Sequence, residues 1–193
     1  MKKYSVILID PPWDMGKVGT GKDTRTPNGY KVGAAIPCPY PVMSQDQIRN
    51  LPVKNISDDI CHLWLWTTNK TLHEAFHLID IYGFKYLNIL TYNKPTGFGP
   101  WFVNTTQHLL FGYKGKLKMG KGRYANTSQY YTPLKHSKKP ESSYSLIESI
   151  SDYDNKIELF ARHKREGWDV WGDEVESDID LLSVAQQDVA PKV

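Results

Sequence analysis

Short apolar runs alternate along the chain with segments whose apolar residues recur at helical spacing. Runs rich in apolar and β-branched residues predict buried strands over residues 4–9, 59–67, 84–92, 108–113, 157–161 and 168–171. Helical spacing predicts a helix that begins at Ser44, one over residues 70–82 that Gly83 ends, and one over residues 140–150. Ser44 and Gln47 have the spacing of a capping box. Strands that alternate with helices predict an α/β fold with a central, mostly parallel sheet flanked by helices.

Three long segments show neither periodicity and are interpreted as loops: residues 14–42, 94–101 and most of 114–139. The first is rich in glycine and proline, and a loop of that length is more often functional than a mere connection. Beyond Glu176 the sequence is acidic and weakly patterned, which is typical of a flexible segment. We therefore expect a single domain over residues 1–176 and a flexible acidic tail over residues 177–193.

Length and composition fit a globular protein of one domain. The 193 residues are 40% hydrophobic and 23% charged, and no apolar run approaches the roughly 20 residues that span a bilayer. The apolar run at residues 6–9 is too short for a signal peptide. Cys38 and Cys61 form neither a disulfide framework nor a CxxC pair, and no ligand spacing indicates a metal site. These features predict a cytoplasmic protein without membrane contact.

The net charge of +3 conceals a strongly basic middle segment. Residues 81–140 contain no acidic residue, whereas residues 141–193 contain thirteen acidic and five basic residues. A basic segment is typical of a surface that binds a polyanion, and this one carries aromatic residues on which bases could stack: Trp101, Phe102, Tyr113, Tyr124, Tyr130 and Tyr131. We predict a nucleic acid partner, with substrate-binding residues Lys116, Lys118, Lys121 and Arg123. The alternative is a solvated basic surface.

The segment Asp10-Pro11-Pro12-Trp13 directly follows the first predicted strand. Ligands of α/β sheets bind beyond the carboxyl ends of strands. Consecutive prolines fix φ and remove two backbone donors, so this turn is rigid and presents acceptors, among them the Asp10 carboxylate and the Pro11 carbonyl. Trp13 offers a ring on which a base can stack. We interpret the four residues as a catalytic loop; the alternative is a strand that ends at prolines and is followed by a core tryptophan.

The same four residues resemble the hallmark of the MT-A70 family of adenine N(6)-methyltransferases, which includes messenger-RNA enzymes and bacterial and phage DNA enzymes. The likeness continues in order over residues 4–176. The matching segments are Tyr40-Pro41-Val42-Met43-Ser44, Leu63-Trp64-Leu65-Trp66-Thr67-Thr68-Asn69, His136-Ser137-Lys138-Lys139-Pro140-Glu141, Lys156-Ile157-Glu158-Leu159-Phe160-Ala161-Arg162, Gly167-Trp168 and Gly172-Asp173-Glu174. The resemblance implies a Rossmann-like S-adenosylmethionine-dependent methyltransferase fold. The order of the motifs is similar to the circularly permuted β group of amino-methyltransferases.

The resemblance also implies roles for individual residues. Asp10 and the Pro11 carbonyl would accept the two N–H bonds of the adenine amino group, and Tyr40 would line the base pocket. Lys139 would pair with the methionine carboxylate of the cofactor. The remaining cofactor contacts would come from Asp10, Arg162, Asp173 and Glu174.

Other interpretations of these residues stay open. Tyr40 could be an ordinary loop aromatic, Lys138 could replace Lys139, and either lysine could bind phosphate. Arg162 could pair with Glu158 at the surface, the acids at 173 and 174 could be solvated, Asn69 could cap a helix, and His108 could be a strand residue. Two departures from the family pattern are Asp173, where the family has asparagine, and Lys164-Arg165, where the messenger-RNA enzymes have His-Asn.

Taken with the resemblance, these residues predict an enzyme that transfers a methyl group from S-adenosylmethionine to the 6-amino group of adenine in nucleic acid. DNA is favoured, because the compact form resembles bacterial and phage enzymes; the expected setting is the cytoplasm of a bacterial or phage-infected cell. The target base must be unpaired or flipped out of its stack. The loops at 14–42 and 94–139 would read the sequence, so specificity is expected to be short or relaxed. The alternatives are RNA adenine methylation and a non-catalytic, nucleic-acid-binding partner in a methyltransferase complex.

Overall fold

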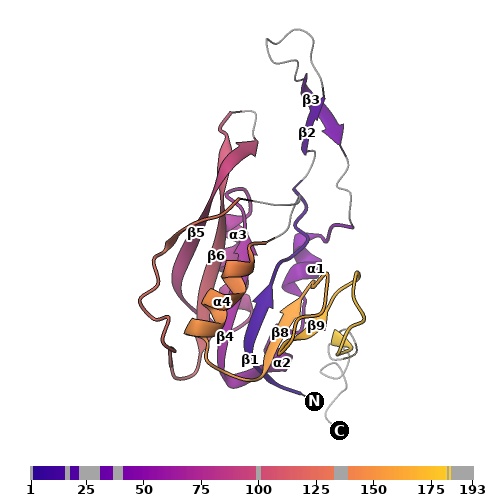
Figure 1. Cartoon of the computed structure of the whole chain (residues 1–193). Helices are drawn as coiled ribbons and strands as arrows, with labels where there is room; N and C mark the ends of the chain where they lie inside the picture. The colour runs from indigo at the N-terminus through magenta and orange to yellow at the C-terminus, as the bar shows by residue number, and fades with distance from the viewer. Residues whose placement is uncertain are drawn as a thin grey trace.

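The computed structural model describes residues 2–15, 18–21, 31–36, 41–98, 101–132, 139–181 and 183. A seven-stranded sheet forms its centre, in the order β7-β5-β6-β4-β1-β8-β9 (Figure 1). The strands are β1 Tyr4–Ile9, β4 Ser57–Thr67, β5 Lys85–Phe98, β6 Asn104–Lys114, β7 Ser128–Tyr130, β8 Lys156–Leu159 and β9 Asp169–Trp171. Adjacent strands are parallel except where β6 pairs with β5 and β4. The predicted α/β fold with a mostly parallel sheet is therefore confirmed.

Helices cover both faces of the sheet: α1 Gln45–Arg49, α2 Val53–Ile56, α3 Leu72–Ile81 and α4 Glu141–Ile150. Successive side chains of a strand point to opposite faces. Ile7 and Ile9 of β1 accordingly join a buried cluster with α1, α2 and α3, while Val6 and Leu8 join a second cluster with α4. Because both faces of β1 are covered, its sequence is a continuous apolar run rather than an alternating one.

Local signals set the ends of two helices where the sequence predicts them. At the start of α1, the Gln47 backbone N–H donates to Ser44 Oγ at 3.2 Å and the Ser44 backbone N–H donates to Gln47 Oε1 at 2.8 Å. This confirms the capping box. Helix α3 begins at Leu72, slightly later than predicted, and Gly83 follows its C-cap with a φ of 79°. Glycine adopts this left-handed conformation without steric cost, which ends the helix.

All three predicted loops contain strands; the one over residues 114–139 contains the short strand β7. Within residues 14–42, β2 Val18–Gly21 and β3 Lys31–Ile36 form an antiparallel hairpin. The segment predicted as a loop from Lys94 onward begins with the last five residues of β5, which continues to Phe98. The prediction was wrong there because β5 pairs only with β6 at that end, so the strand has no buried sheet face to impose an apolar pattern.

The far end of the β5–β6 hairpin extends beyond its neighbours in the sheet. The last pair between β4 and β6 joins Thr67 to His108, whereas β5 and β6 stay paired out to Phe98 and Asn104. We call residues 94–98 and 101–106 the β5–β6 arm. It projects past the carboxyl end of β1, on the same side as the β2–β3 hairpin (Figure 1).

Residues 177–181, predicted as the start of a flexible tail, pack on the domain. Asp178 Oδ2 accepts a hydrogen bond from the Val170 backbone N–H at 2.9 Å, and Asp178 Oδ1 pairs with Lys164 Nζ at 2.9 Å. Leu181 is completely buried in the core. The domain therefore reaches at least Leu181, while residues 184–193 of the predicted tail lie outside the described part of the chain. Among the described residues, no helix has the length and apolarity needed to span a bilayer.

Candidate active site

A cavity of about 240 Å³ lies at the carboxyl ends of β1, β4, β8 and β9, where an α/β sheet places its ligands. The segments after these four strands supply most of its walls. They are joined by Lys139, which lies two residues before α4, by Gln107 of β6, and by Pro41 and Met43 of the segment before α1. The lining residues are Asp10, Pro11, Pro12, Trp13, Met15, Pro41, Met43, Thr67, Thr68, Gln107, Lys139, Phe160, Ala161, Arg162, Trp171, Asp173 and Glu174.

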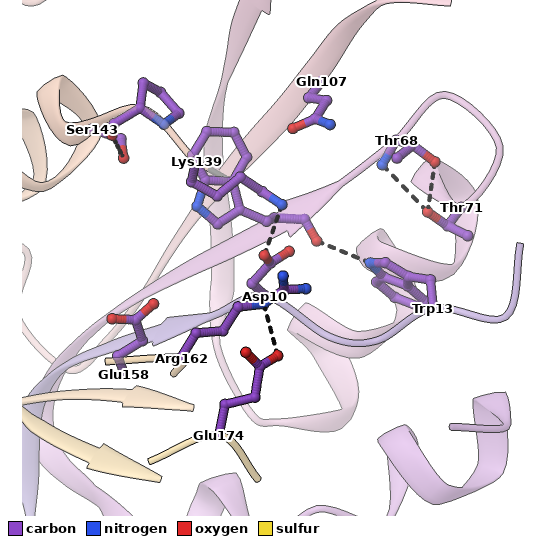
Figure 2. A network of polar contacts seen from close by, with 12 residues as sticks. Asp10, Trp13, Thr68, Thr71, Gln107, Lys139, Ser143, Glu158, Arg162 and Glu174 are labelled. Atoms are coloured by element: carbon purple, nitrogen blue, oxygen red, sulfur yellow. Dashed lines mark hydrogen bonds and ion pairs between the residues drawn. The ribbon is translucent and has the colours of Figure 1, made fainter. Parts of the chain in front are cut away.

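The Asp10 carboxylate is held by Lys139. Lys139 Nζ donates to Asp10 Oδ2 at 2.7 Å (Figure 2), and the two side chains are 16% and 27% exposed respectively. The same ammonium lies 5.3 Å from the centroid of the Trp66 ring, an attractive cation–π arrangement. Lys139 was expected on the carboxylate of the cofactor; the structure places it on the carboxylate of Asp10.

The loop after β1 is anchored through Trp13. Its indole N–H donates to the Trp66 carbonyl at 3.1 Å (Figure 2), and its backbone N–H donates to the Pro11 carbonyl at 2.8 Å. The Met43 backbone N–H donates to the Pro12 carbonyl at 3.0 Å. Because Trp13 is packed in the core and only 6% exposed, it does not offer the open stacking face that the sequence suggested. It forms part of the cavity wall and fixes the loop that carries Asp10.

The wall opposite this loop is built by two turns that approach each other closely. A Cβ on Gly172 would lie 2.2 Å from the Ala161 carbonyl oxygen, so only glycine allows the turn after β9 to meet the turn after β8. Phe160 has a φ of 66°, a left-handed conformation that is rare for bulky residues and is often found at functional sites. Its ring packs edge-on against Trp171, with the centroids 5.2 Å apart.

Three of the five residues predicted to hold the cofactor, Arg162, Asp173 and Glu174, lie together on this second wall. Arg162 Nε is 3.5 Å from Glu174 Oε1 (Figure 2), and both side chains are substantially exposed, at 42% and 60%. Asp173 lines the same wall. Sequence reasoning did not single out Phe160 or Trp171, although both lie in or beside the segments that carried the resemblance.

A buried polar cluster lies between β8 and α4. Glu158, 8% exposed, accepts a hydrogen bond from the Tyr144 hydroxyl at 2.8 Å. The Arg165 guanidinium lies 3.7 Å from the centroid of the Tyr144 ring and pairs with Glu141. Burial raises the pKa of Glu158 to about 7, and the negative charge of Asp10 acts in the same direction. The protonation of Glu158 is therefore coupled to the charge in the cavity.

Polar groups from the β5–β6 hairpin and the segment after β7 approach the cavity from the other side. Gln107 lines it, and its Oε1 accepts from the Tyr131 hydroxyl at 3.4 Å. Burial, together with the charge of Asp10, raises the pKa of Tyr131 to about 12. Burial and the positive charge of Lys139 lower the pKa of Lys94. Gln107 and Lys94 carried no signal in the sequence because the segments around them lack a regular apolar pattern.

The structure does not bring the four predicted basic substrate-binding residues to the cavity. Lys116, Lys118, Lys121 and Arg123 are exposed on the segment that follows β6. Because β6 is antiparallel, it returns the chain to the opposite end of the sheet, where Gly120 donates to the carbonyl of Ile150 at the end of α4. A role for these residues in binding nucleic acid stays a prediction. The predicted pocket residue Tyr40 lies outside the described residues.

The described walls fit the cofactor that the resemblance implies. Carboxylates at Asp173 and Glu174 can accept hydrogen bonds from ribose hydroxyls, as acidic residues at strand ends do in dinucleotide-binding folds. Phe160 and Trp171 supply an aromatic surface beside them, and Lys139 supplies a cation for a carboxylate. No group of His, Cys, Asp and Glu within the described ranges could hold a metal ion.

Comparisons with known proteins agree with this geometry. The MT-A70 family model matches residues 4–174. The type II methyltransferase M.MunI of a Mycoplasma species is 32% identical over 185 residues, which cover 90% of this chain and 78% of the relative. The N(6)-adenosine-methyltransferase MT-A70-like protein of Arabidopsis thaliana and the N(6)-adenosine-methyltransferase catalytic subunit METTL3 of Homo sapiens are each 24% identical, over 86% and 83% of this chain. The matched regions span only 23% and 26% of those two relatives. The chain therefore belongs to the MT-A70 family of S-adenosylmethionine-dependent methyltransferases.

Proposed function

We propose that this protein transfers the methyl group of S-adenosylmethionine to the 6-amino group of adenine in DNA. The observation that carries the proposal is the position of Asp10, whose carboxylate follows β1, lines the cavity and is held by Lys139. The names of the plant and animal relatives, N(6)-adenosine-methyltransferases, support adenine as the target.

The 6-amino nitrogen of adenine is a poor nucleophile because its lone pair is delocalised into the ring. A carboxylate has about four acceptor sites and a carbonyl two. Asp10 can therefore hold Lys139 and still accept one amino N–H, and the Pro11 carbonyl can accept the other beside its bond to Trp13. These two acceptors would turn the nitrogen lone pair towards the methyl group, which the bound cofactor supplies as an electrophile. Such alignment can lower a barrier by about 7–11 kcal/mol.

Residues on the second wall would orient the cofactor. We assign its ribose to Arg162, Asp173 and Glu174, which line the cavity together. An ammonium has three donors, so Lys139 can hold Asp10 and at the same time meet the methionine carboxylate of the cofactor. That bridging role combines the contact seen in the structure with the role expected from the family.

DNA is favoured over RNA by the extent of the matches. The alignment with the type II methyltransferase covers 78% of that relative, so the two chains are similar in overall size. The adenosine methyltransferases share only about a quarter of their length with this chain. RNA is the second candidate, because the names of those relatives specify the ribonucleoside.

The proposal is tested by incubating the protein with labelled S-adenosylmethionine and matched single- and double-stranded DNA and RNA, with and without adenine. We expect label on adenine-containing DNA only, released on digestion as N(6)-methyldeoxyadenosine. Asp10→Asn should lower the rate by about a hundredfold or more. Asp59→Asn is the matched control, since Asp59 is an exposed carboxylate near the amino end of β4.

Label on RNA alone would show that RNA, the second candidate, is the substrate and that DNA is not. Label that does not depend on adenine, or an Asp10→Asn variant as active as Asp59→Asn, would overturn the proposal. A protein that binds nucleic acid without transferring any label would instead be the non-catalytic partner of a methyltransferase complex. The intact Asp10–Lys139 pair argues against that outcome.

A further inference from the structure

The end of the β5–β6 arm exposes three consecutive large apolar side chains. Trp101 is 90% exposed, Phe102 83% and Val103 66%. We call these three residues the arm tip. A soluble surface seldom leaves a contiguous apolar group uncovered unless it contacts another molecule.

The arm tip stands on a braced support. The Asn69 side-chain amide donates to Asn104 Oδ1 and to Thr106 Oγ1, both at 3.0 Å, and its Oδ1 lies 2.6 Å from His108 Nε2. One side chain at the end of β4 thus contacts three alternate residues of β6. These bonds fix the direction in which the arm leaves the sheet, so the tip holds a set position beyond the carboxyl ends of the strands (Figure 1).

The base of the arm adjoins the cavity. Gln107, the residue after the arm on β6, lines the cavity wall. Lys94, the first residue of the arm, is near enough to Lys139 for the positive charge of Lys139 to lower the pKa of Lys94. A molecule whose reacting group enters the cavity would therefore meet the arm as it extends outward.

The charge of the surrounding sequence favours a polyanion as that molecule. Residues 81–140 contain no Asp or Glu, so neither strand of the arm carries a negative side chain. Burial and the positive charge of Lys139 lower the pKa of Lys94, and a phosphate beside the two lysines would relieve their repulsion. The apolar tip suits contact with stacked bases, and the absence of acidic side chains on the arm suits contact with the phosphates of nucleic acid.

We propose that the arm tip inserts into double-stranded DNA beside the target adenine and occupies the space that this base leaves when it turns into the cavity. The inference rests on the proposed function, because it takes adenine as the base in the cavity. Turning a base out of a duplex costs its pairing and stacking. Apolar side chains that enter the stack offset part of that cost by replacing the lost contacts. Trp101 and Phe102 have the size and exposure for this role.

The test compares duplex and single-stranded substrates. Trp101→Ala/Phe102→Ala is assayed for methyl transfer to synthetic random-sequence DNA in both forms, beside a Leu87→Ala control. Leu87 is an exposed apolar residue near the amino end of β5, at the other end of that strand from the arm. We expect the arm variant to lose about tenfold or more of the activity on duplex DNA and to stay within about twofold of wild type on single strands, where no base has to be turned out. The control should keep both activities.

Equal losses on both substrates, or no loss on either, would overturn the proposal. Sedimentation of the free proteins tests the other occupant of the tip, a second copy of the chain. A wild type that is dimeric and an arm variant that is monomeric would assign the tip to that contact and overturn the proposal.

Fluorescence anisotropy of labelled duplex separates this inference from the proposed function. If wild type transfers no methyl group to any substrate, the proposed function fails. Duplex binding that weakens about tenfold in the arm variant but not in Asp59→Asn or Leu87→Ala would still support insertion. Duplex binding that the arm variant retains in full would overturn it.

Discussion

Lys139 and Asp10 are separated by 129 residues in sequence, and the Lys139 ammonium lies 2.7 Å from Asp10 Oδ2 at the carboxyl end of β1. The pair forms one side of the cavity, because Asp10 follows the central strand and Lys139 lies two residues before α4. Charge-assisted hydrogen bonds of this kind hold a carboxylate in one orientation. The structure thus connects the proposed catalytic group to the helix that packs over it.

The first prediction concerns Lys139 itself. Lys139→Met keeps a long side chain but removes the cation, so Asp10 loses its orienting partner. A hydrogen bond to a charged group contributes about 1.5–3 kcal/mol, and we expect kcat to fall about tenfold to a hundredfold. The KM for S-adenosylmethionine should rise as well, because the same ammonium is proposed to meet the cofactor. Lys139→Arg restores a cation and should partly restore both kcat and the KM for S-adenosylmethionine. Steady-state kinetics with each substrate varied separately measures the two effects.

Lys54→Met is the matched control, since Lys54 is exposed on α2, which lies just before the amino end of β4. It should leave kcat and KM within about twofold of wild type. A Lys139→Met variant with unchanged kcat and a raised KM would show that Lys139 serves the cofactor and not Asp10.

The second prediction concerns the close approach of two turns. Gly172→Ala would place a Cβ 2.2 Å from the Ala161 carbonyl oxygen, so the turns after β8 and β9 must separate. We expect a loss of about 2–4 kcal/mol in the free energy of unfolding and weaker binding of S-adenosylmethionine, measured by calorimetry. Gly167→Ala is the control. Gly167 has a φ of 76°, but a Cβ there would meet nothing within 4 Å, so alanine costs only backbone strain, about 1 kcal/mol. Equal effects of the two substitutions on cofactor affinity would contradict this assignment.

The third prediction uses the pH dependence of stability. The carboxyl of Glu158 titrates near 4.5 in the unfolded chain, and burial raises its pKa to about 7 in the fold. Between these values the folded state keeps a proton that the unfolded state has released, so this group lowers stability as pH rises through that window. The full effect is about 3 kcal/mol. Glu158→Gln cannot ionise and should therefore be more stable than wild type above pH 7, but nearly equal to it near pH 4.5.

Urea denaturation of both proteins across this range measures the difference. Burial lowers the pKa of His62 to about 4, so the contribution of His62 to stability increases as pH rises, opposite to that of Glu158. For this reason two proteins are compared and a single stability curve is not interpreted alone. That contribution is common to both proteins and cancels in the difference. Parallel stability curves for wild type and Glu158→Gln would show that the fold does not raise the pKa of Glu158.

The buried part of the fold could be predicted from the sequence because burial on both faces leaves an unmistakable pattern. The strand predicted over residues 4–9 is β1, residue for residue. The capping box of α1 could also be predicted, because the hydrogen bonds between Ser44 and Gln47 are local in sequence. The candidate catalytic loop was located correctly at the end of β1 for the same reason: Asp10 and the two prolines stop an apolar run.

The arm, the Lys139–Asp10 bond and the position of the basic residues depend on contacts between distant segments, which a local sequence pattern cannot predict. The arm strands past Asn93 pair only with each other, so they lack the apolar face that would have identified them. The bond between Lys139 and Asp10 joins distant segments, and the family resemblance alone assigned Lys139 to the cofactor. Charge density predicted substrate-binding residues on the segment after β6, and this prediction stays untested. Antiparallel β6 carries the lysines after it away from the cavity, whereas Lys94, isolated in the sequence, lies near it.

The last prediction concerns which lysines meet the phosphates of DNA. Lys94 is partly buried at the base of the arm, beside the charge of Lys139, whereas Lys118 is exposed at the opposite end of the sheet. Each phosphate contact adds about one unit to the slope of log affinity against log salt. Lys94→Gln should therefore weaken binding to duplex DNA and reduce that slope by about one, while Lys118→Gln should change neither. Anisotropy titrations at several salt concentrations give both quantities. If charge reversal at Lys116, Lys118 and Lys121 flattens the slope while Lys94→Gln does not, the exposed segment after β6 binds the phosphates, and the DNA extends across the sheet rather than along the arm.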